Sequence, residues 1–275
     1  SNVYINTRMS KTPTLRLGLI VDNKRLNVVE TLLHRIGEYL LLMKRVVAKP
    51  ENGKYFRKQV VDEINGLCID SLPIVIIISV FMGAVITIQT KLQIENPLLP
   101  TWTIGFVVRQ SIVLEFAPTI VSIFLAGKIG SQIASEIGTM KVTEQVDALE
   151  TMGINSASHL IFPKILACIF TNPLLIIISI FLAILGGWAA AEFLGTIPSS
   201  QYIEGIRSWF VARDIYYALV KTFFFAFLMA SIAGYWGYKT VGGALEVGKT
   251  STQAVVTSSF MILLFDLLLT ELFLG

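Results

Sequence analysis

The chain has 275 residues, of which 54% are hydrophobic and 15% are charged. Soluble domains average roughly 45–50% apolar and about 25% charged residues, so this composition does not fit one or two soluble domains. The formal net charge of +3 is small, and no nucleic-acid partner is expected from it. A mean hydropathy of +0.69 indicates a membrane protein instead.

The chain begins with polar, mixed sequence, and residues 1–25 are interpreted as a variable tail. Apolar residues then recur at helical spacing from Leu26 to Val47. This segment is too charged to cross a bilayer, and its pattern favours an amphipathic helix lying in the membrane interface. A surface helix packed on a soluble domain is the alternative. Residues 26–70 are therefore expected to form an interfacial helix and a basic linker, ahead of a five-span domain at residues 71–275.

Five apolar stretches are long enough to cross a bilayer, which takes about 20 residues. These predicted spans are Ser71–Thr90, Trp102–Ala126, Ile165–Ala191, Ile215–Tyr238 and Thr250–Phe273. The sequence thus predicts an all-α integral membrane fold.

The segments between the spans are polar or rich in turn residues. The motif ENPLLPTW is a short turn, residues 128–164 are polar enough to lie outside the bilayer, and residues 192–214 form a loop with a short helix. Basic residues before the first span place the N-terminus in the cytoplasm, and five spans then place the C-terminus on the opposite face. Residues 128–164 and 239–249 are accordingly expected to be cytoplasmic.

The stretch GGALEVGKTS contains a literal match to the phosphate-binding P-loop, from Gly243 through Gly248 and Lys249 to Thr250. A working P-loop follows a β-strand within an α/β domain that also supplies an acidic magnesium-binding residue. Here the match lies in a short turn between two predicted spans. The match is therefore interpreted as fortuitous.

The polar segment between the second and third spans reads AGKIGSQIASEIGTMKVTEQVDALETMGIN. Val142, Val146 and Leu149 fall on one face of a short helix, and Gly153 stands where a helix C-cap would. The stripe upstream is out of phase, which predicts a break near Gly138. Such a helix could dock on another protein. The alternative, a helix lying flat on the membrane, is disfavoured because anionic lipid would repel its acidic face.

Charged residues inside the predicted spans need partners. Glu115 at mid-bilayer costs about 2.5–3.5 kcal/mol or more unless it faces a partner or water. Arg109 precedes Glu115 by six positions, about 240° around a helix, so the two do not share a face. Glu115 therefore requires a partner from another helix or subunit, and Lys221 and Asp266 are the other candidates. A polar site beside a lipid cavity or a moving hinge, and a satisfied pair between helices, remain equal alternatives.

The segment EFAPTIVSIFLAGKIGSQIASEIGTMKVTEQVDALETMGIN resembles the MlaE (YrbE) permease family, the membrane subunits of bacterial lipid ABC transporters. The resemblance continues in GGALEVGKTSTQAVVTSSF and LLFDLLLTELF, and it covers about residues 30–275. The chain departs from the family pattern at Ala117, where glycine is frequent, and at Lys128, where arginine is usual. Leu114 stands where some members carry arginine.

The resemblance implies a homodimer of five-span subunits in the bacterial inner membrane, bound to a cytoplasmic ABC ATPase. ATP and magnesium would be held by that ATPase, so no cofactor is expected on this chain, and the chain itself is expected not to be an enzyme. A periplasmic lipid-binding protein with an Mce domain would be a further partner. Phospholipid moving between inner and outer membranes, in support of outer-membrane lipid asymmetry, would be the substrate.

The resemblance also implies that residues 141–152, approximately, form the coupling helix that responds to the ATPase. The residues expected to take part in this coupling are Glu136, Gly138, Met140, Thr143, Glu144, Gln145, Asp147 and Glu150. The candidates for an intramembrane polar site or lipid path are Arg109, Glu115, Pro118, Lys128, Lys221 and Asp266.

Two rival functions belong to other classes. An intramembrane lipid-modifying enzyme would place a nucleophile and a base at membrane depth, but neither His34 nor His159 lies in a predicted span. A secondary transporter would favour paired broken helices and inverted repeats, which the pattern does not show. ATP hydrolysis that depends on a second subunit would separate the permease from both.

Overall fold

The computed structural model describes residues 30, 33–47, 53–94, 100–195 and 197–274. The chain divides into two units, residues 1–44 and residues 45–275. In the first unit, residues 33–44 are helical, as their spacing predicts. The predicted tail at residues 1–25 lies outside the described residues, as does most of the ENPLLPTW turn. The interfacial position of the first helix stays a prediction.

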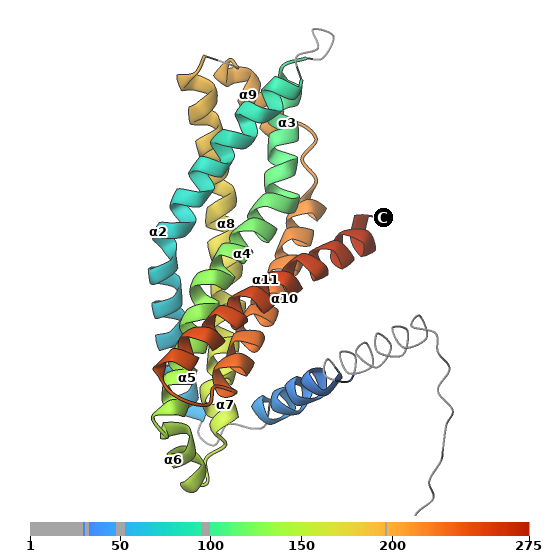
Figure 1. Ribbon diagram of the computed structural model, residues 1–275. Helices are drawn as coiled ribbons and strands as arrows, with labels where there is room; N and C mark the ends of the chain where they lie inside the picture. The colour runs from blue at the N-terminus through green and yellow to red at the C-terminus, as the bar shows by residue number, and fades with distance from the viewer. Residues whose placement is uncertain (1–29, 31–32, 48–52, 95–99, 196, 275) are drawn as a thin grey trace, which may run out of the picture. The chain divides into compact units, whose positions relative to one another are not determined.

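The second unit is built from long helices (Figure 1). Among the described residues, five segments are long and apolar enough to cross a membrane: Phe56–Gln93, Trp102–Val142, Ser156–Phe193, Ala212–Tyr238 and Ala244–Phe273. These segments confirm the five predicted spans and their order. The chain is a multi-pass helical membrane protein.

The first long helix, α2 (Gly53–Gln93), begins well before the predicted span and contains Pro73. It includes residues that we expected to form a basic linker. Its 41 residues extend about 60 Å at 1.5 Å per residue. Because a bilayer's hydrocarbon core is about 30 Å thick, part of α2 must project beyond it.

The second long segment is continuous but changes its helical geometry. It runs through α3 (Trp102–Ser111), the π-helix η1 (Ile112–Val121), α4 (Ser122–Leu125), the π-helix η2 (Ala126–Gly130) and α5 (Ser131–Val142). Pro118 lies within η1 and cannot donate a backbone hydrogen bond, which favours a wider local turn. The charged residue Glu115 lies in the same π-helix.

The predicted break near Gly138 is wrong. Gly138 is buried inside α5, and the helix continues to Val142. A Cβ at Gly138 would lie 3.0 Å from the Thr240 hydroxyl oxygen, so the glycine allows close packing rather than a bend. The chain turns instead at Thr143 and Glu144, where Glu144 has a φ of 62°.

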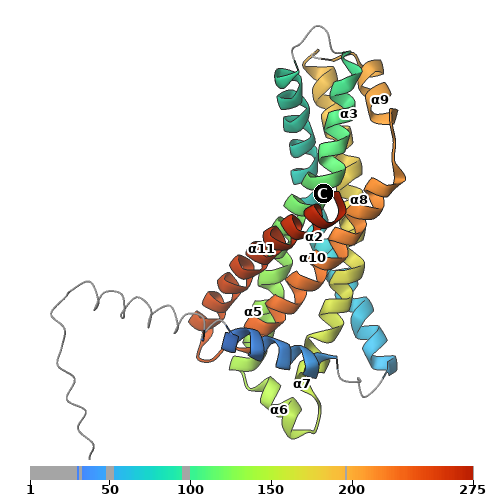
Figure 2. The same cartoon turned by 90° about the vertical axis from the view of Figure 1, so that its right-hand side faces the viewer.

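The third span packs closely on the first. Helix α8 (Phe162–Phe193) runs alongside α2 in both views (Figures 1 and 2). A Cβ on Gly186 would lie 2.2 Å from the Val80 carbonyl oxygen, and one on Gly83 would lie 1.8 Å from the Ala183 carbonyl oxygen. The glycines therefore bring two backbones together. The Ser79 hydroxyl also donates to the Ser179 hydroxyl across this contact, at 2.8 Å.

We expect Gly83→Ala to destabilise the bundle, because the new methyl group meets backbone atoms that cannot rotate away. The expected loss is about 1–3 kcal/mol, the usual range for overpacking. Gly66→Ala in the same helix is the matched control, since nothing lies within 4 Å of its added Cβ. Thermal unfolding in detergent should show a lower midpoint for Gly83→Ala alone. Equal midpoints for the two variants would contradict the close contact.

The two ends of the second unit carry different short helices. The turn between α10 (Ala212–Tyr238) and α11 (Ala244–Leu274) lies at the same end as α6 (Gln145–Thr151) and α7 (Ser156–Leu160). Helix α9 (Ser199–Arg207) lies at the opposite end (Figure 2). This arrangement agrees with the predicted sharing of one membrane face by residues 128–164 and 239–249. Which face is cytoplasmic stays a prediction.

Candidate functional site

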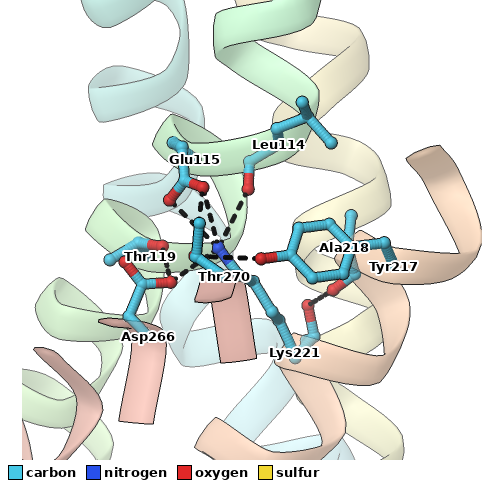
Figure 3. Close-up of polar contacts among 9 residues, drawn as sticks. Leu114, Glu115, Thr119, Tyr217, Ala218, Lys221, Asp266 and Thr270 are labelled. Carbon is cyan, nitrogen blue, oxygen red and sulfur yellow. Dashed lines mark hydrogen bonds and ion pairs between the residues drawn. The ribbon is translucent and has the colours of Figure 1, made fainter. Parts of the chain in front are cut away.

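An ionic network joins the second, fourth and fifth spans (Figure 3). The Lys221 ammonium nitrogen on α10 lies 2.9 and 3.0 Å from the two carboxylate oxygens of Glu115 on η1. It also lies 2.7 Å from Oδ1 of Asp266 on α11. The Lys221 side chain is fully buried, whereas 41% of the Glu115 side chain is exposed. The predicted need of Glu115 for a partner from another helix is therefore confirmed.

Neutral hydroxyl groups complete the network. The Thr119 hydroxyl donates to Oδ1 of Asp266 at 3.0 Å, and the Thr270 hydroxyl donates to Oε1 of Glu115 at 3.4 Å. The Tyr217 hydroxyl donates to Thr270 at 2.9 Å. These three residues were not predicted from the sequence, because a hydroxyl in an apolar stretch gives no signal of its own. Each carboxylate thus has a charged and a neutral donor.

The charge of the network does not balance. With all groups ionised, two carboxylates face one ammonium group. Glu115 is the more exposed of the two carboxylates, since Asp266 is only 16% exposed. A proton or a cationic group reaching Glu115 would neutralise the excess charge. The same arrangement also ties three helices together, so a polar site and a structural ion pair are both compatible with it.

Arg109, which we predicted as a candidate for an intramembrane polar site, binds backbone carbonyls. Its guanidinium donates to the carbonyl oxygens of Ile206, Ser208 and Trp209, at 2.8, 2.7 and 3.2 Å. These carbonyls lie at and just beyond the end of α9, where Trp209 has a φ of 50°. Arg109 is thus a clamp on the connector at residues 208–211 and takes no part in the network of Lys221.

The position of this connector explains why it needs a clamp. It leads from α9 to the start of α10, which lies part-way along the bundle (Figures 1 and 2). Irregular backbone at membrane depth is tolerated only where its polar groups are satisfied within the protein. The planar guanidinium of Arg109 satisfies three carbonyls at once.

We expect Arg109→Lys to loosen the connector, because an ammonium group cannot reproduce the fork of the guanidinium. The expected destabilisation is about 1.5–3 kcal/mol, the value of a hydrogen bond to a charged group. Arg213→Lys is the control, since Arg213 is exposed near the start of the same helix α10. Limited proteolysis at residues 208–211 should be faster for Arg109→Lys only. Unchanged proteolysis would contradict the clamp.

Two further predicted residues of the intramembrane group lie outside the ionic network. Pro118 is buried in η1, one turn from Glu115. Lys128 lies in η2, and among the described residues its ammonium group takes part in no ion pair. Their predicted roles in a lipid path stay predictions.

The predicted coupling segment forms the short helix α6 between two turns. Glu144 and Gln145 are exposed at its start, while Val146 is fully buried. Gly153 has a φ of 81°, and the Ile154 amide donates to the Leu149 carbonyl at 3.0 Å. The glycine stop predicted for this helix is therefore confirmed as a C-cap. The helix itself is shorter than the predicted 141–152.

Two acidic residues of α6, Asp147 and Glu150, make contacts with neighbouring helices. Asp147 pairs with Lys141 at 2.6 Å, and Glu150 accepts hydrogen bonds from Ser156 and Tyr238 at 2.8 Å each. The bond from the Ser156 hydroxyl, and then that from Tyr238, lower the pKa of Glu150 below its usual range. The carboxylate is therefore ionised at neutral pH, and its bonds are lost only as the pH falls through that lowered pKa. Asp147 and Glu150 thus connect α6 to neighbouring helices, although both are exposed, as are Glu144 and Gln145.

Glu136 belongs to a second buried ion cluster. The Lys164 ammonium group on α8 lies 2.6 Å from Glu63 on α2 and 2.8 Å from Glu136 on α5. Only 3% of the Lys164 side chain is exposed. Beside it is a cavity of about 370 Å³, lined in part by Lys58, Glu63 and Glu136. Lys164 lies just before the third predicted span, and its sequence position did not indicate this cluster.

The geometry defines a helical membrane protein with buried charge pairs between its spans and a short exposed helix in one loop. Comparison with known proteins gives the family. Residues 60–272 match the family model described as Permease MlaE. The chain belongs to the MlaE permease family.

Individual relatives agree with this assignment. A protein of Rickettsia bellii is 38% identical over 203 residues, which cover 74% of this chain and 78% of the relative. A Rickettsia felis protein is 32% identical over 86% of this chain and 92% of its own length. A protein of Synechocystis is 33% identical over 80% of this chain and 83% of its own. All three names begin with "Probable ABC transporter permease protein".

Proposed function

We propose that this chain is the membrane-spanning permease subunit of an ABC transporter that moves phospholipid between the inner and outer membranes of a bacterium. The observation that carries the proposal is the match to the MlaE permease family across all five candidate spans. The names of the relatives support the assignment to an ABC transporter. Such a permease takes its energy from ATP hydrolysis on a separate subunit.

The geometry of the P-loop match supports a chain without ATPase activity of its own. Residues from Ala244 to Thr250 form the first turns of α11, whereas a P-loop needs an open loop whose amides surround phosphate. Lys249 pairs with Glu246, and the Thr250 hydroxyl donates to the Glu246 carbonyl at 3.0 Å. We therefore assign ATP and magnesium to the partner ATPase.

Helix α6 is the proposed contact with that ATPase. It projects from the end of the bundle that carries the α10–α11 turn, and its residues Glu144 and Gln145 are exposed. In this proposal that end faces the cytoplasm, and the N-terminus lies on the same side. A second copy of the chain and a periplasmic Mce-domain protein complete the proposed assembly in the inner membrane.

The experiment is affinity purification of the tagged chain from its native membrane in mild detergent. Mass spectrometry would identify the proteins that elute with it, and thin-layer chromatography would identify the lipids. The proposal predicts a P-loop ATPase, an Mce-domain protein and phospholipid. A chain that elutes with phospholipid but without an ATPase would favour the lipid-modifying enzyme or the secondary transporter instead.

A further inference from the structure

Tyr238, the last residue of α10, is hydrogen-bonded to the predicted coupling helix α6. The hydroxyl group of Tyr238 lies 2.8 Å from Oε1 of Glu150 on α6 and 2.9 Å from the Ser156 hydroxyl on α7. Ser156 also donates to the same oxygen of Glu150, at 2.8 Å. One carboxylate oxygen of Glu150 thus accepts hydrogen bonds from the end of the fourth span and from the start of the third.

The end of the second span reaches the same cluster. The Lys141 ammonium group, near the end of α5, lies 2.6 Å from Asp147 on α6 and 5.9 Å from the centre of the Tyr238 ring. Three membrane-spanning segments therefore meet α6 through side chains at its acidic face. Asp147 and Glu150 make these contacts although both residues are exposed.

The backbone on either side of α6 is not helical. Glu144 precedes it with a φ of 62°, and Gly153 follows it with a φ of 81°. A short helix between two such turns is positioned by its side-chain contacts, since neither neighbouring helix continues into it. In contrast, α10 is one uninterrupted helix from Ala212 to Tyr238. Lys221 lies on it about 25 Å from Tyr238 at 1.5 Å per residue.

We propose that the Tyr238 hydroxyl is a positioning contact that transmits movement of α6 to α10, and thereby to the network of Lys221, Glu115 and Asp266. The inference rests on the proposed function, in which a partner ATPase displaces α6. The hydrogen bond that the Tyr238 hydroxyl donates to Glu150 makes α10 follow α6. Without the hydroxyl, α6 keeps its link to α5 through Asp147 but loses its hydrogen bond to α10.

The test compares Tyr238→Phe with the wild-type chain, each reconstituted with the co-purified ATPase and Mce-domain protein in phospholipid vesicles. The substitution keeps the ring and removes only the hydroxyl. ATP hydrolysis and transfer of a fluorescent phospholipid are measured on the same vesicles. Tyr216→Phe is the matched control, because Tyr216 lies on the same helix, at its other end, and is 74% exposed.

We expect Tyr238→Phe to assemble normally and to hydrolyse ATP, while the phospholipid transferred per ATP falls at least about fivefold. Glu150→Ala should give a similar fall. The double variant should lose no more than either single variant, because both remove one contact. If the Tyr238 hydroxyl had only a structural role, Tyr238→Phe would assemble less well with the ATPase, and the phospholipid transferred per ATP would be unchanged.

Two results would overturn the inference. One is a transfer-to-hydrolysis ratio for Tyr238→Phe equal to that of Tyr216→Phe. The other is failure of Tyr238→Phe to assemble with the ATPase, which would assign the hydroxyl to structural support. If the wild-type vesicles themselves transfer no phospholipid on ATP addition, the proposed function fails, and the two failures are thus distinguishable.

Discussion

Replacing Lys221 with methionine is expected to destabilise the protein by about 3–5 kcal/mol, the usual effect of removing one partner from a buried ion pair. The Lys221 side chain is fully buried, and its ammonium group lies within 3.0 Å of both Glu115 and Asp266. Without it, two carboxylates face each other between three spans. Chemical denaturation in detergent measures the free energy of unfolding of the variant and of the wild type.

The design of this experiment separates charge from packing. Lys249→Met is the control, because Lys249 is 58% exposed and its surface pair contributes only about 0–1 kcal/mol. The triple variant Glu115→Gln, Lys221→Met and Asp266→Asn should recover much of the lost stability, since no charge is left unpaired. A Lys221→Met protein as stable as the wild type would contradict the central place of this network.

Lys164→Met is expected to have the second-largest effect. Lys164 joins Glu63 and Glu136 from two other helices, and only 3% of its side chain is exposed. Lys164 makes one contact with each carboxylate, whereas Lys221 contacts both oxygens of Glu115 as well as Asp266. The expected loss is therefore about 3 kcal/mol, at the lower end of the range for a buried pair.

Lys58→Met is the control for this second cluster, since the exposed Lys58 lines the same cavity without entering the ion pair. Chemical denaturation should show a lower midpoint for Lys164→Met and little change for Lys58→Met. If Lys58→Met were as destabilising, general loss of positive charge at this end of the bundle would be the cause. The specific pairing of Lys164 would then be wrong.

The number and order of the spans could be predicted from the sequence because they depend on local composition. Each predicted span lies inside a helix, and the helices extend beyond the apolar stretches, as α2 does from Gly53. Hydropathy marks the part of a helix that is apolar, whereas the helix continues for as long as its hydrogen bonds do. The predicted break near Gly138 rested instead on a change of phase in the apolar stripe, and α5 continues through Gly138 to Val142 because this glycine packs against Thr240.

The partners of the buried charges could be predicted only in part. The cost of an unpaired Glu115 in a bilayer implied a partner on another helix, and Lys221 and Asp266 were the remaining candidates. Lys164 gave no such signal, because a lysine at the start of an apolar stretch resembles an ordinary membrane boundary. Its bonds to Glu63 and Glu136 depend on how α2, α5 and α8 pack together.

Arg109 and Tyr238 illustrate the same limit at opposite ends of the bundle. Arg109 binds backbone carbonyls about a hundred residues away in the chain, and carbonyls carry no sequence signal. Tyr238 ends a span, where aromatic residues are common, so nothing in its own position indicated a bond to Glu150. Both contacts depend on the tertiary arrangement of the helices.

The most direct test of the proposed function is ATP-dependent phospholipid transfer by this chain, reconstituted with its ATPase and the proposed Mce-domain partner. The measurement compares a wild-type ATPase with one whose own P-loop lysine is replaced by alanine. The proposed function predicts phospholipid transfer only with ATP and the wild-type ATPase, and no ATP hydrolysis by this chain alone. Phospholipid transfer that does not depend on ATP, or ATP hydrolysis by this chain alone, would contradict the proposed function.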